Sequence, residues 1–132
     1  MTALTIAGLA QAGGVGVETV RYYHRRGLLA QPDRPARGVR RYDVDDVRRL
    51  QFIRAAQSAG FSLEQIGELL ELDSSHDRER ARALARARIE ELEQRISSLQ
   101  AARDWLSDLE RDCADNATGP CPILKAFNER AA

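Results

Sequence analysis

One stretch in the second half of the chain restricts the possible folds more than any other. From Arg78 to Cys113 the sequence contains neither proline nor glycine and is dense in Ala, Arg, Glu and Leu. These residues favour helix, and a helix of this length spans roughly 50 Å at 1.5 Å per residue. Its apolar positions recur at spacings of three and four residues: Ala85, Ile89, Leu92, Ile96, Leu99, Ala102, Leu106 and Leu109. That spacing predicts a coiled-coil seam.

The seam also bears on the number of chains. A chain of 132 residues forms one domain, or a small domain with an appendage. Because so small a domain does not cover a seam of this length from within, the favoured interpretation is that a second copy covers it. An intramolecular hairpin with the preceding helices is the alternative.

The first thirty residues carry two short helical patterns. Residues 5–12 predict one helix, with Thr5 as its N-cap, and residues 17–26 predict the next. The glycine-rich segment 13–16 separates them. Two short helices joined by a glycine-bearing turn are typical of a helix-turn-helix.

The pattern after these helices continues with a loop rich in proline, glycine and arginine. Residues 39–42 then predict a small wing, as a short β-hairpin. Residues 43–59 predict a helix capped by Asp43, and Gly60 ends it. A further helix is predicted over 62–72, because its first residue forms a capping box with Gln65.

Charge is distributed unevenly along the chain. The whole is neutral, with 20 basic and 20 acidic residues, yet residues 1–50 hold nine arginines against five acids. A basic half joined to an acidic half is typical of a nucleic-acid-binding module with a second region that does not bind nucleic acid. Chance scatter of surface charge is the alternative explanation.

The only two cysteines, Cys113 and Cys121, flank a short polar loop after the long predicted helix. No apolar run has the length of a membrane span, and the N-terminus has no signal-peptide pattern. We therefore expect a cytoplasmic protein with no membrane partner. In that reducing compartment the cysteines are expected to be free thiols.

Five segments stand in order along the chain: Ile6-Ala-Gly-Leu-Ala, Val17-Glu-Thr-Val-Arg-Tyr-Tyr, Arg26-Gly-Leu-Leu, Arg40-Arg-Tyr and Gly60-Phe-Ser-Leu-Glu-Gln-Ile. In content and spacing they resemble the MerR family of transcription regulators, and the resemblance extends over the whole chain. It implies a mainly α fold: a winged helix-turn-helix DNA-binding domain, a helix pair, a long antiparallel coiled-coil dimerisation helix and a C-terminal cysteine loop.

The resemblance also implies a division of the chain. Residues 1–72 would form the DNA-binding domain with its connecting helices, and residues 73–79 a hinge. Residues 80–112 would form the dimerisation helix, and residues 113–132 the metal-binding loop and C-terminal tail.

Several side chains of the predicted second helix and wing suit DNA binding. Arginine forms bidentate contacts with guanine or phosphate, and hydroxyl groups bond phosphate oxygens. The predicted DNA-binding residues are Thr19, Arg21, Tyr22, Arg40, Arg41 and Tyr42. Tyr23 is assigned to the core instead, because Tyr22 follows Arg21 toward the exposed side. Ordinary packing or solvation is the alternative for each residue.

The resemblance implies a function through DNA distortion. Family dimers bind a palindrome within a promoter whose two polymerase-recognition elements are too far apart, and the effector makes the bound dimer bend and untwist that DNA. Bending a site costs on the order of 1–6 kcal/mol, which ligand binding can supply. The expected partners are double-stranded promoter DNA, a second copy of the chain and RNA polymerase at the promoter.

Metal-sensing members of the family bind a soft metal ion with two cysteines that flank such a loop, so the resemblance implies that Cys113 and Cys121 are ligands. Soft thiolates select copper(I), silver, gold, mercury or zinc. The copper-efflux branch of the family also lacks a third cysteine at the start of the long helix, and the Cys-x7-Cys spacing is similar to that branch, so the resemblance favours copper(I). Mercury(II) is the close alternative, since it also accepts two thiolates and the DNA-binding half is most similar to the mercury-responsive branch.

Two hinge residues bear on the choice of metal. Copper-sensing members typically have a serine where this chain has His76 or Asp77, and a carboxylate favours a doubly charged ion. Both residues are therefore possible additional ligands. A charge at a helix start interacting with the macrodipole explains Asp77 equally well, and solvation in a hinge explains His76.

Other classes of function fit the sequence less well. The chain has no glycine-rich phosphate loop and no zinc-protease pattern, so we do not expect an enzyme. A regulator of the same family that senses a non-metal signal is a second hypothesis. Drug-binding members usually carry a large additional domain, however, and redox-sensing members need four cysteines for an iron–sulfur cluster. A metal-buffering protein would leave the winged helix unexplained.

Overall fold

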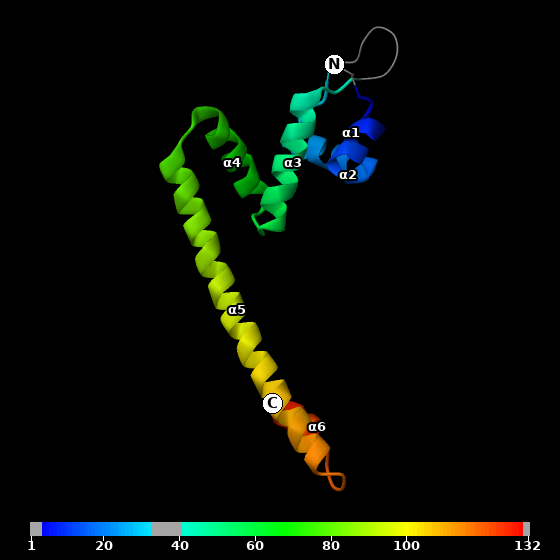
Figure 1. The fold of residues 1–132 in the computed structure, drawn as a ribbon, viewed down its shortest axis with the longest axis vertical. Helices are drawn as coiled ribbons and strands as arrows, with labels where there is room; N and C mark the ends of the chain where they lie inside the picture. The colour runs from blue at the N-terminus through cyan, green and yellow to red at the C-terminus, as the bar shows by residue number, and fades with distance from the viewer. Residues whose placement is uncertain (1–3, 33–40, 131–132) are drawn as a thin grey trace. The chain divides into compact units, whose positions relative to one another are not determined.

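The computed structural model describes residues 4–32 and 41–130 of the chain. Over those residues the secondary structure consists of six helices and one isolated β-bridge. The helices are α1 (Ile6–Gly13), α2 (Val17–Arg25), α3 (Val44–Ser58), α4 (Leu63–Ser75), α5 (Arg78–Asp115) and α6 (Pro122–Arg130), as Figure 1 shows. The predicted mainly α fold, with a helix-turn-helix and one long helix, is confirmed. Two compact units make up the chain, Met1–Leu84 and Ala85–Ala132.

The first unit has one continuous apolar core. Helices α1 and α2 pack together, α1 packs on α3, and α3 packs on α4. The largest fully buried side chains come from these helices and the segments between them: Tyr42, Leu9, Leu29, Leu50, Ile53, Ile66 and Val20. Burial of each leucine or isoleucine side chain stabilises the fold by about 1.5–3 kcal/mol. This core therefore holds the first four helices in place.

Polar side chains cap three of these helices at the predicted positions. Thr5 Oγ1 accepts a hydrogen bond from a first-turn backbone N–H of α1 at 3.1 Å. Asp43 and Asp46 form a reciprocal capping box at the start of α3, and Ser62 and Gln65 form one at the start of α4. Because each cap satisfies backbone N–H groups that have no partner within the helix, the helices begin where the sequence predicted.

The turn between α1 and α2 depends on tertiary contacts as well as on glycine. Gly14 has φ 70°, in the left-handed region. A Cβ atom at Gly13 would lie 2.3 Å from Leu50 Cδ2, so α1 and α3 approach closely there. Arg54 Nη1 donates hydrogen bonds to the carbonyl oxygens of Gly13 and Gly14 at 2.8 and 2.7 Å. A side chain of α3 thus fixes the end of α1.

The junction between α4 and α5 is shorter than the predicted hinge. Helix α4 extends to Ser75, beyond its predicted end at Leu72, and α5 begins at Arg78. His76 reverses the chain with φ 59°, the one positive value among the described non-glycine residues. Asp77 Oδ1 accepts the Arg80 N–H at 3.2 Å, so Asp77 caps the start of α5.

The second unit is built differently from the first. Figure 1 shows α6 alongside the last turns of α5. None of residues 85–130 is buried. The predicted seam is exposed, with Ile89 and Ile96 at 52% and Leu99 at 63% of their maximum accessibility.

In the described part of the chain no helix, α5 included, has the length and apolar character needed to cross a membrane.

Candidate nucleic-acid interface and metal centre

Helix α2 turns one face to the core and the other to solvent. Val20 and Tyr23 are buried, and the Tyr23 hydroxyl donates a hydrogen bond to the Gln57 side-chain oxygen. Burial raises the pKa of Tyr23 above its usual value. The assignment of Tyr23 to the core is confirmed. Arg21 and Tyr22 are exposed on the other face.

The exposed face of α2 brings together polar groups that suit a nucleic acid. Arg21 Nη1 lies 2.5 Å from Glu18 Oε1, and the Arg25 guanidinium lies 5.9 Å from the centre of the Tyr22 ring. The exposed Arg21–Glu18 pair contributes little to stability, about 0–1 kcal/mol. Thr19, on the same helix, is half-buried.

The wing residues behave less uniformly than the sequence suggested. Tyr42 is 2% exposed, its backbone pairs with that of Leu4, and its ring stacks on His24 with 5.9 Å between ring centres. Because the ring is enclosed in the core, Tyr42 anchors the segment after the wing rather than offering its ring to DNA, which corrects the prediction. Arg41 beside it is exposed. Arg40 lies outside the described residues, as does residue 39 of the predicted wing.

The two cysteines meet where α5 passes into α6. Cys113 lies in the last turn of α5, and Cys121 directly precedes α6. Their Sγ atoms are 3.8 Å apart, and both are free, half-buried thiols. The fold therefore brings together two soft ligands that are eight positions apart in sequence.

The start of α6 makes the two thiols unequal. The Leu124 N–H, and with it the Ile123 N–H, lowers the pKa of Cys121 below its usual value, since these groups stabilise the thiolate. The pKa of Cys113 is raised above its usual value, first by the hydrogen bond between Cys113 and Cys121 and then by the charge of Cys121. The first N–H groups of α6 thus favour the thiolate form of Cys121, the form that a metal ion requires.

The thiol spacing is compatible with a shared soft metal ion. With metal–sulfur bonds of about 2.3 Å, as for zinc, two bonds at a tetrahedral angle place the sulfurs about 3.8 Å apart. Two bonds in line place them about 4.6 Å apart, so linear coordination requires an outward movement of about 0.8 Å. The donor set fits a soft ion in either arrangement.

Additional ligands do not gather at a single point. Over the described ranges, no group of three or more His, Cys, Asp or Glu side chains is placed to hold a metal ion. His76 and Asp77 lie between α4 and α5, in the first unit, where Asp77 caps a helix. The capping role explains Asp77 without a metal.

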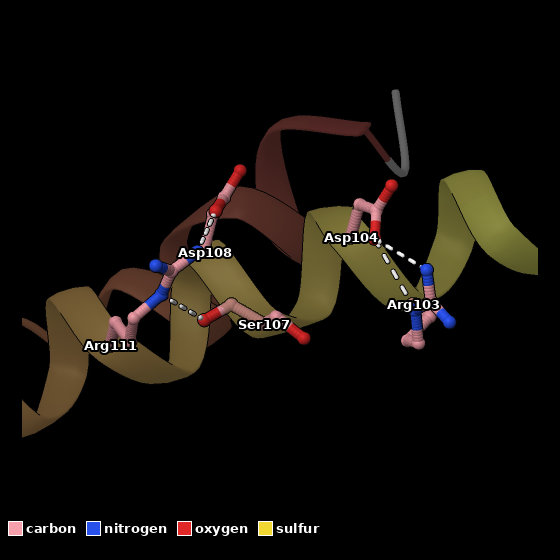
Figure 2. A network of polar contacts seen from close by, with 5 residues as sticks. All are labelled: Arg103, Asp104, Ser107, Asp108 and Arg111. Carbon is pink, nitrogen blue, oxygen red and sulfur yellow. Dashed lines mark hydrogen bonds and ion pairs between the residues drawn. The ribbon is translucent and has the colours of Figure 1, made fainter.

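The face of α5 near the cysteine loop carries ion pairs between neighbouring side chains. Figure 2 shows Arg103 beside Asp104, with 3.1 Å between Nη2 and Oδ1, and Arg111 beside Asp108 at 2.5 Å. The Arg111 Nε also donates to the Ser107 carbonyl oxygen. All four paired side chains are largely exposed.

Sequence reasoning missed helix α6 and the residues that pack it on α5. The rings of Trp105 and Phe127 lie 5.5 Å apart, and the Arg130 guanidinium lies 4.5 Å from the centre of the Trp105 ring. Two signals for the helix are present in the sequence. Pro122 occupies the first helical position, which proline favours, and Ile123 and Phe127 have the four-residue spacing of one helix face.

Comparison with known proteins identifies the family to which these elements belong. A family profile described as "MerR HTH family regulatory protein" matches residues 4–73, and one described as "MerR, DNA binding" matches residues 47–109. The mercuric resistance operon regulatory protein of Serratia marcescens is 41% identical, covering 94% of this chain and 87% of its own length. The HTH-type transcriptional regulator HmrR of Sinorhizobium medicae (strain WSM419) is 36% identical, covering 92% and 84%.

Solved structures agree with these relatives. The transcription regulator PbrR691 from Ralstonia metallidurans CH34, in complex with lead(II), has a TM-score of 0.77 and 32% identity, covering 94% of this chain and 98% of that one. MerR from Bacillus megaterium MB1, in complex with mercury(II), has a TM-score of 0.69 and 32% identity over the same shares. The helix-turn-helix, the long helix and these similarities together show that the chain belongs to the MerR family of helix-turn-helix transcriptional regulators.

Proposed function

We propose that this MerR-type, metal-responsive transcriptional regulator binds promoter DNA as a homodimer and is switched by a soft metal ion held by Cys113 and Cys121. Mercury(II) is the first candidate for that ion. The observation that carries the proposal is the convergence of the chain's only two thiols, 3.8 Å apart, at the junction of α5 and α6.

The choice of mercury(II) reverses the order of preference reached from sequence, where copper(I) came first. Two relatives of about 40% identity are mercuric resistance operon regulatory proteins. A structural relative holds mercury(II). Copper(I) remains the second candidate because the described residues offer two thiols with no further grouped ligand, and two thiolates suffice for a monovalent soft ion.

Dimerisation follows from the apolar seam of α5. The seam is exposed along one chain, and an exposed apolar stripe with this heptad spacing is stabilised by a second helix. A dimer presents two copies of α2, and two-fold symmetry matches a palindromic DNA site. RNA polymerase, positioned at the same promoter, is the proposed recipient of the signal.

Each of the two units has its own task in this proposal. On the DNA side, Arg21 is held by Glu18 and Tyr22 is exposed beside it, so α2 offers a guanidinium and a phenol to the groove or to phosphates. Thr19, Arg40 and Arg41 are proposed as further contacts.

On the metal side, Cys113 ends one helix and Cys121 starts the next. The ion would supply an acceptor for two thiolate electron pairs. The chain's own contribution is to bring the sulfurs together, and to stabilise the Cys121 thiolate with the first N–H groups of α6.

The test is a competition titration of the reduced dimer with mercury(II), copper(I) and zinc(II), followed by transcription from the target promoter. Cys113→Ser and Cys121→Ser should each bind the operator normally and lose the metal response, because serine is a hard ligand that a soft ion does not prefer. Metal-dependent activation that persists in the double variant would contradict the proposal.

The role of Asp77 needs a variant that keeps the helix cap. Asp77→Asn retains a capping side chain and removes the negative charge. If Asp77 acts only as a cap, the mercury(II) response is unchanged. A lost divalent response with intact copper(I) binding would instead assign Asp77 as a ligand, and His76→Gln tests the neighbouring residue in the same way.

A further inference from the structure

We propose that Trp105, Phe127 and Arg130 form a latch between α5 and α6 that sets the spacing of the two thiols. These three side chains are called the aromatic latch below. The inference rests on the proposed role of Cys113 and Cys121 as metal ligands, and it assigns positioning residues to that site.

The contacts of the latch join the two helices that carry the cysteines. Trp105 lies on α5 about two turns before Cys113. Its ring meets Phe127 of α6, with 5.5 Å between ring centres and a tilt of 41°. Arg130, in the last turn of α6, places its guanidinium 4.5 Å from the centre of the same indole ring. One α5 side chain therefore receives two separate contacts from α6.

The position of Cys121 depends on where α6 packs. Cys113 is part of α5 and moves with it. Cys121 follows a loop in which Gly119 has φ 94°. The carbonyl oxygen of Cys121 accepts the Lys125 N–H at 3.0 Å, so Cys121 belongs to the first turn of α6. Because α6 carries Cys121 as a nearly rigid extension, the contacts of Phe127 and Arg130 with Trp105 fix the distance between the two sulfurs.

The chemistry of the contacts makes the latch selective for certain substitutions. Tilted aromatic pairs and a cation over an indole face both have a favoured geometry, and a neutral amide does not replace the cation. Lysine in place of arginine keeps the positive charge. We therefore expect Arg130→Gln to weaken the contact that sets the thiol spacing, and Arg130→Lys to retain it.

The first measurement needs no metal. In a glutathione redox buffer, glutathione disulfide oxidises the two thiols to one intramolecular disulfide and is itself reduced to two glutathione molecules. The equilibrium constant reports the effective concentration of one thiol at the other. Relative to the wild type, we expect it to fall about two- to fivefold in Arg130→Gln and about tenfold in Phe127→Ala.

A matched control uses the same substitution at an exposed arginine of α5 that pairs within its own helix. Arg103 pairs with Asp104 and stands two positions from Trp105, as Figure 2 shows for the pair. Arg103→Gln should leave the equilibrium constant of the thiols at the wild-type value, and Arg130→Lys should have the wild-type value as well. Circular dichroism of each variant reports whether overall helix content is retained.

The second measurement is mercury(II) affinity by competition with a small dithiol. Arg130→Gln and Phe127→Ala should lower the affinity in the same order as they lower the effective concentration. A wild-type protein that binds no mercury(II) or copper(I) would refute the proposed function, while the glutathione equilibrium still decides whether the latch exists. Wild-type values of that equilibrium in both latch variants, or an equal loss in Arg103→Gln, would overturn the latch.

Discussion

The two units of this chain hold their helices by different means. In the first unit, apolar side chains of several helices share one core, and capping boxes close the starts of α3 and α4. In the second, no described side chain is buried, α6 meets α5 through a few contacts, and the seam of α5 faces solvent. The first unit thus carries its own core, whereas the second leaves its apolar seam exposed, as the proposed dimer requires.

The largest expected effect breaks that interface. Leu92→Glu combined with Leu99→Glu places four charges in the seam of a dimer, where burial of an unpaired charge is costly. We expect a monomer in sedimentation equilibrium and loss of operator binding. The core of the first unit contains neither residue, so its helices should remain folded.

A matched control places the same charges on the opposite face of the helix. By the heptad spacing, Gln94→Glu combined with Ala101→Glu lies away from the seam. This variant should remain dimeric. A dimer that survives the seam substitutions, or a monomer produced by the control, would show that α5 does not form the interface.

The next effect addresses the core of the first unit. Leu50 is fully buried between α3 and α1, so Leu50→Ala should lower the free energy of unfolding by about 2–5 kcal/mol. Urea unfolding of the wild type and of Leu50→Ala measures this loss. The difference between the two proteins should be the same at every protein concentration, because the substitution leaves the proposed dimer interface unchanged. The loss in Leu99→Ala should instead vary with protein concentration, because in the proposed dimer the contacts of Leu99 come from the partner. The same concentration dependence for both variants would remove the distinction between the units.

A smaller effect tests whether DNA recognition belongs to the first unit alone. Arg21→Ala should weaken specific operator binding by about 1–3 kcal/mol if the guanidinium contacts a base, with less effect on unrelated DNA. Metal affinity should be unchanged, since the thiols lie in the other unit. Affinities are compared at matched salt, with Arg26→Ala as a control at the C-cap of the same helix. Unchanged operator affinity in Arg21→Ala would show that α2 is not the reading helix.

The smallest expected effect concerns a single cap. Ser62→Ala removes the hydroxyl that accepts the Gln65 N–H at 3.2 Å and should lower the free energy of unfolding by about 0.5–2 kcal/mol. Ser98→Ala, in the interior of α5, removes a hydroxyl without removing a cap and serves as the control. Equal losses in the two variants would mean that the capping box contributes nothing particular to this unit.

The sequence predicted the local features of the fold well. Thr5, Asp43 and Ser62 cap helices as expected, because a cap depends on residues within one turn. The distinction between Tyr22 and Tyr23 was also predicted locally, from the position of Tyr22 next to the exposed Arg21. The end of α4 was less predictable, since the Asp73-Ser74-Ser75 segment suits either a loop or a last turn. In the structure the Ser74 and Ser75 hydroxyls donate to carbonyl oxygens one turn earlier, which keeps the helix intact.

Features that depend on distant residues could not be predicted in the same way. Tyr42 follows two arginines and is of a residue type that often contacts DNA. In the structure, however, its backbone pairs with that of Leu4 and its ring stacks on His24. The pairing of Cys113 with Cys121 was predicted from the family resemblance, while their actual separation depends on α6, which the sequence reading missed. Its contact with Trp105 links residues about twenty positions apart, beyond the reach of local propensity.

The arginines of α3 have a consequence for the transfer of this DNA-reading motif to other proteins. Arg54 holds the two carbonyl oxygens at the end of α1, and Arg49 Nε donates to the Leu28 carbonyl oxygen just after α2 at 2.7 Å. The turn of the helix-turn-helix and the segment directly after α2 are therefore both tied to α3, which follows them in sequence. A peptide cut after Leu29 would lose both ties, together with the buried face of α3. The smallest segment that can be transferred to another protein with its geometry intact accordingly extends through α3. A graft of α1 and α2 alone would not keep the angle between these two helices.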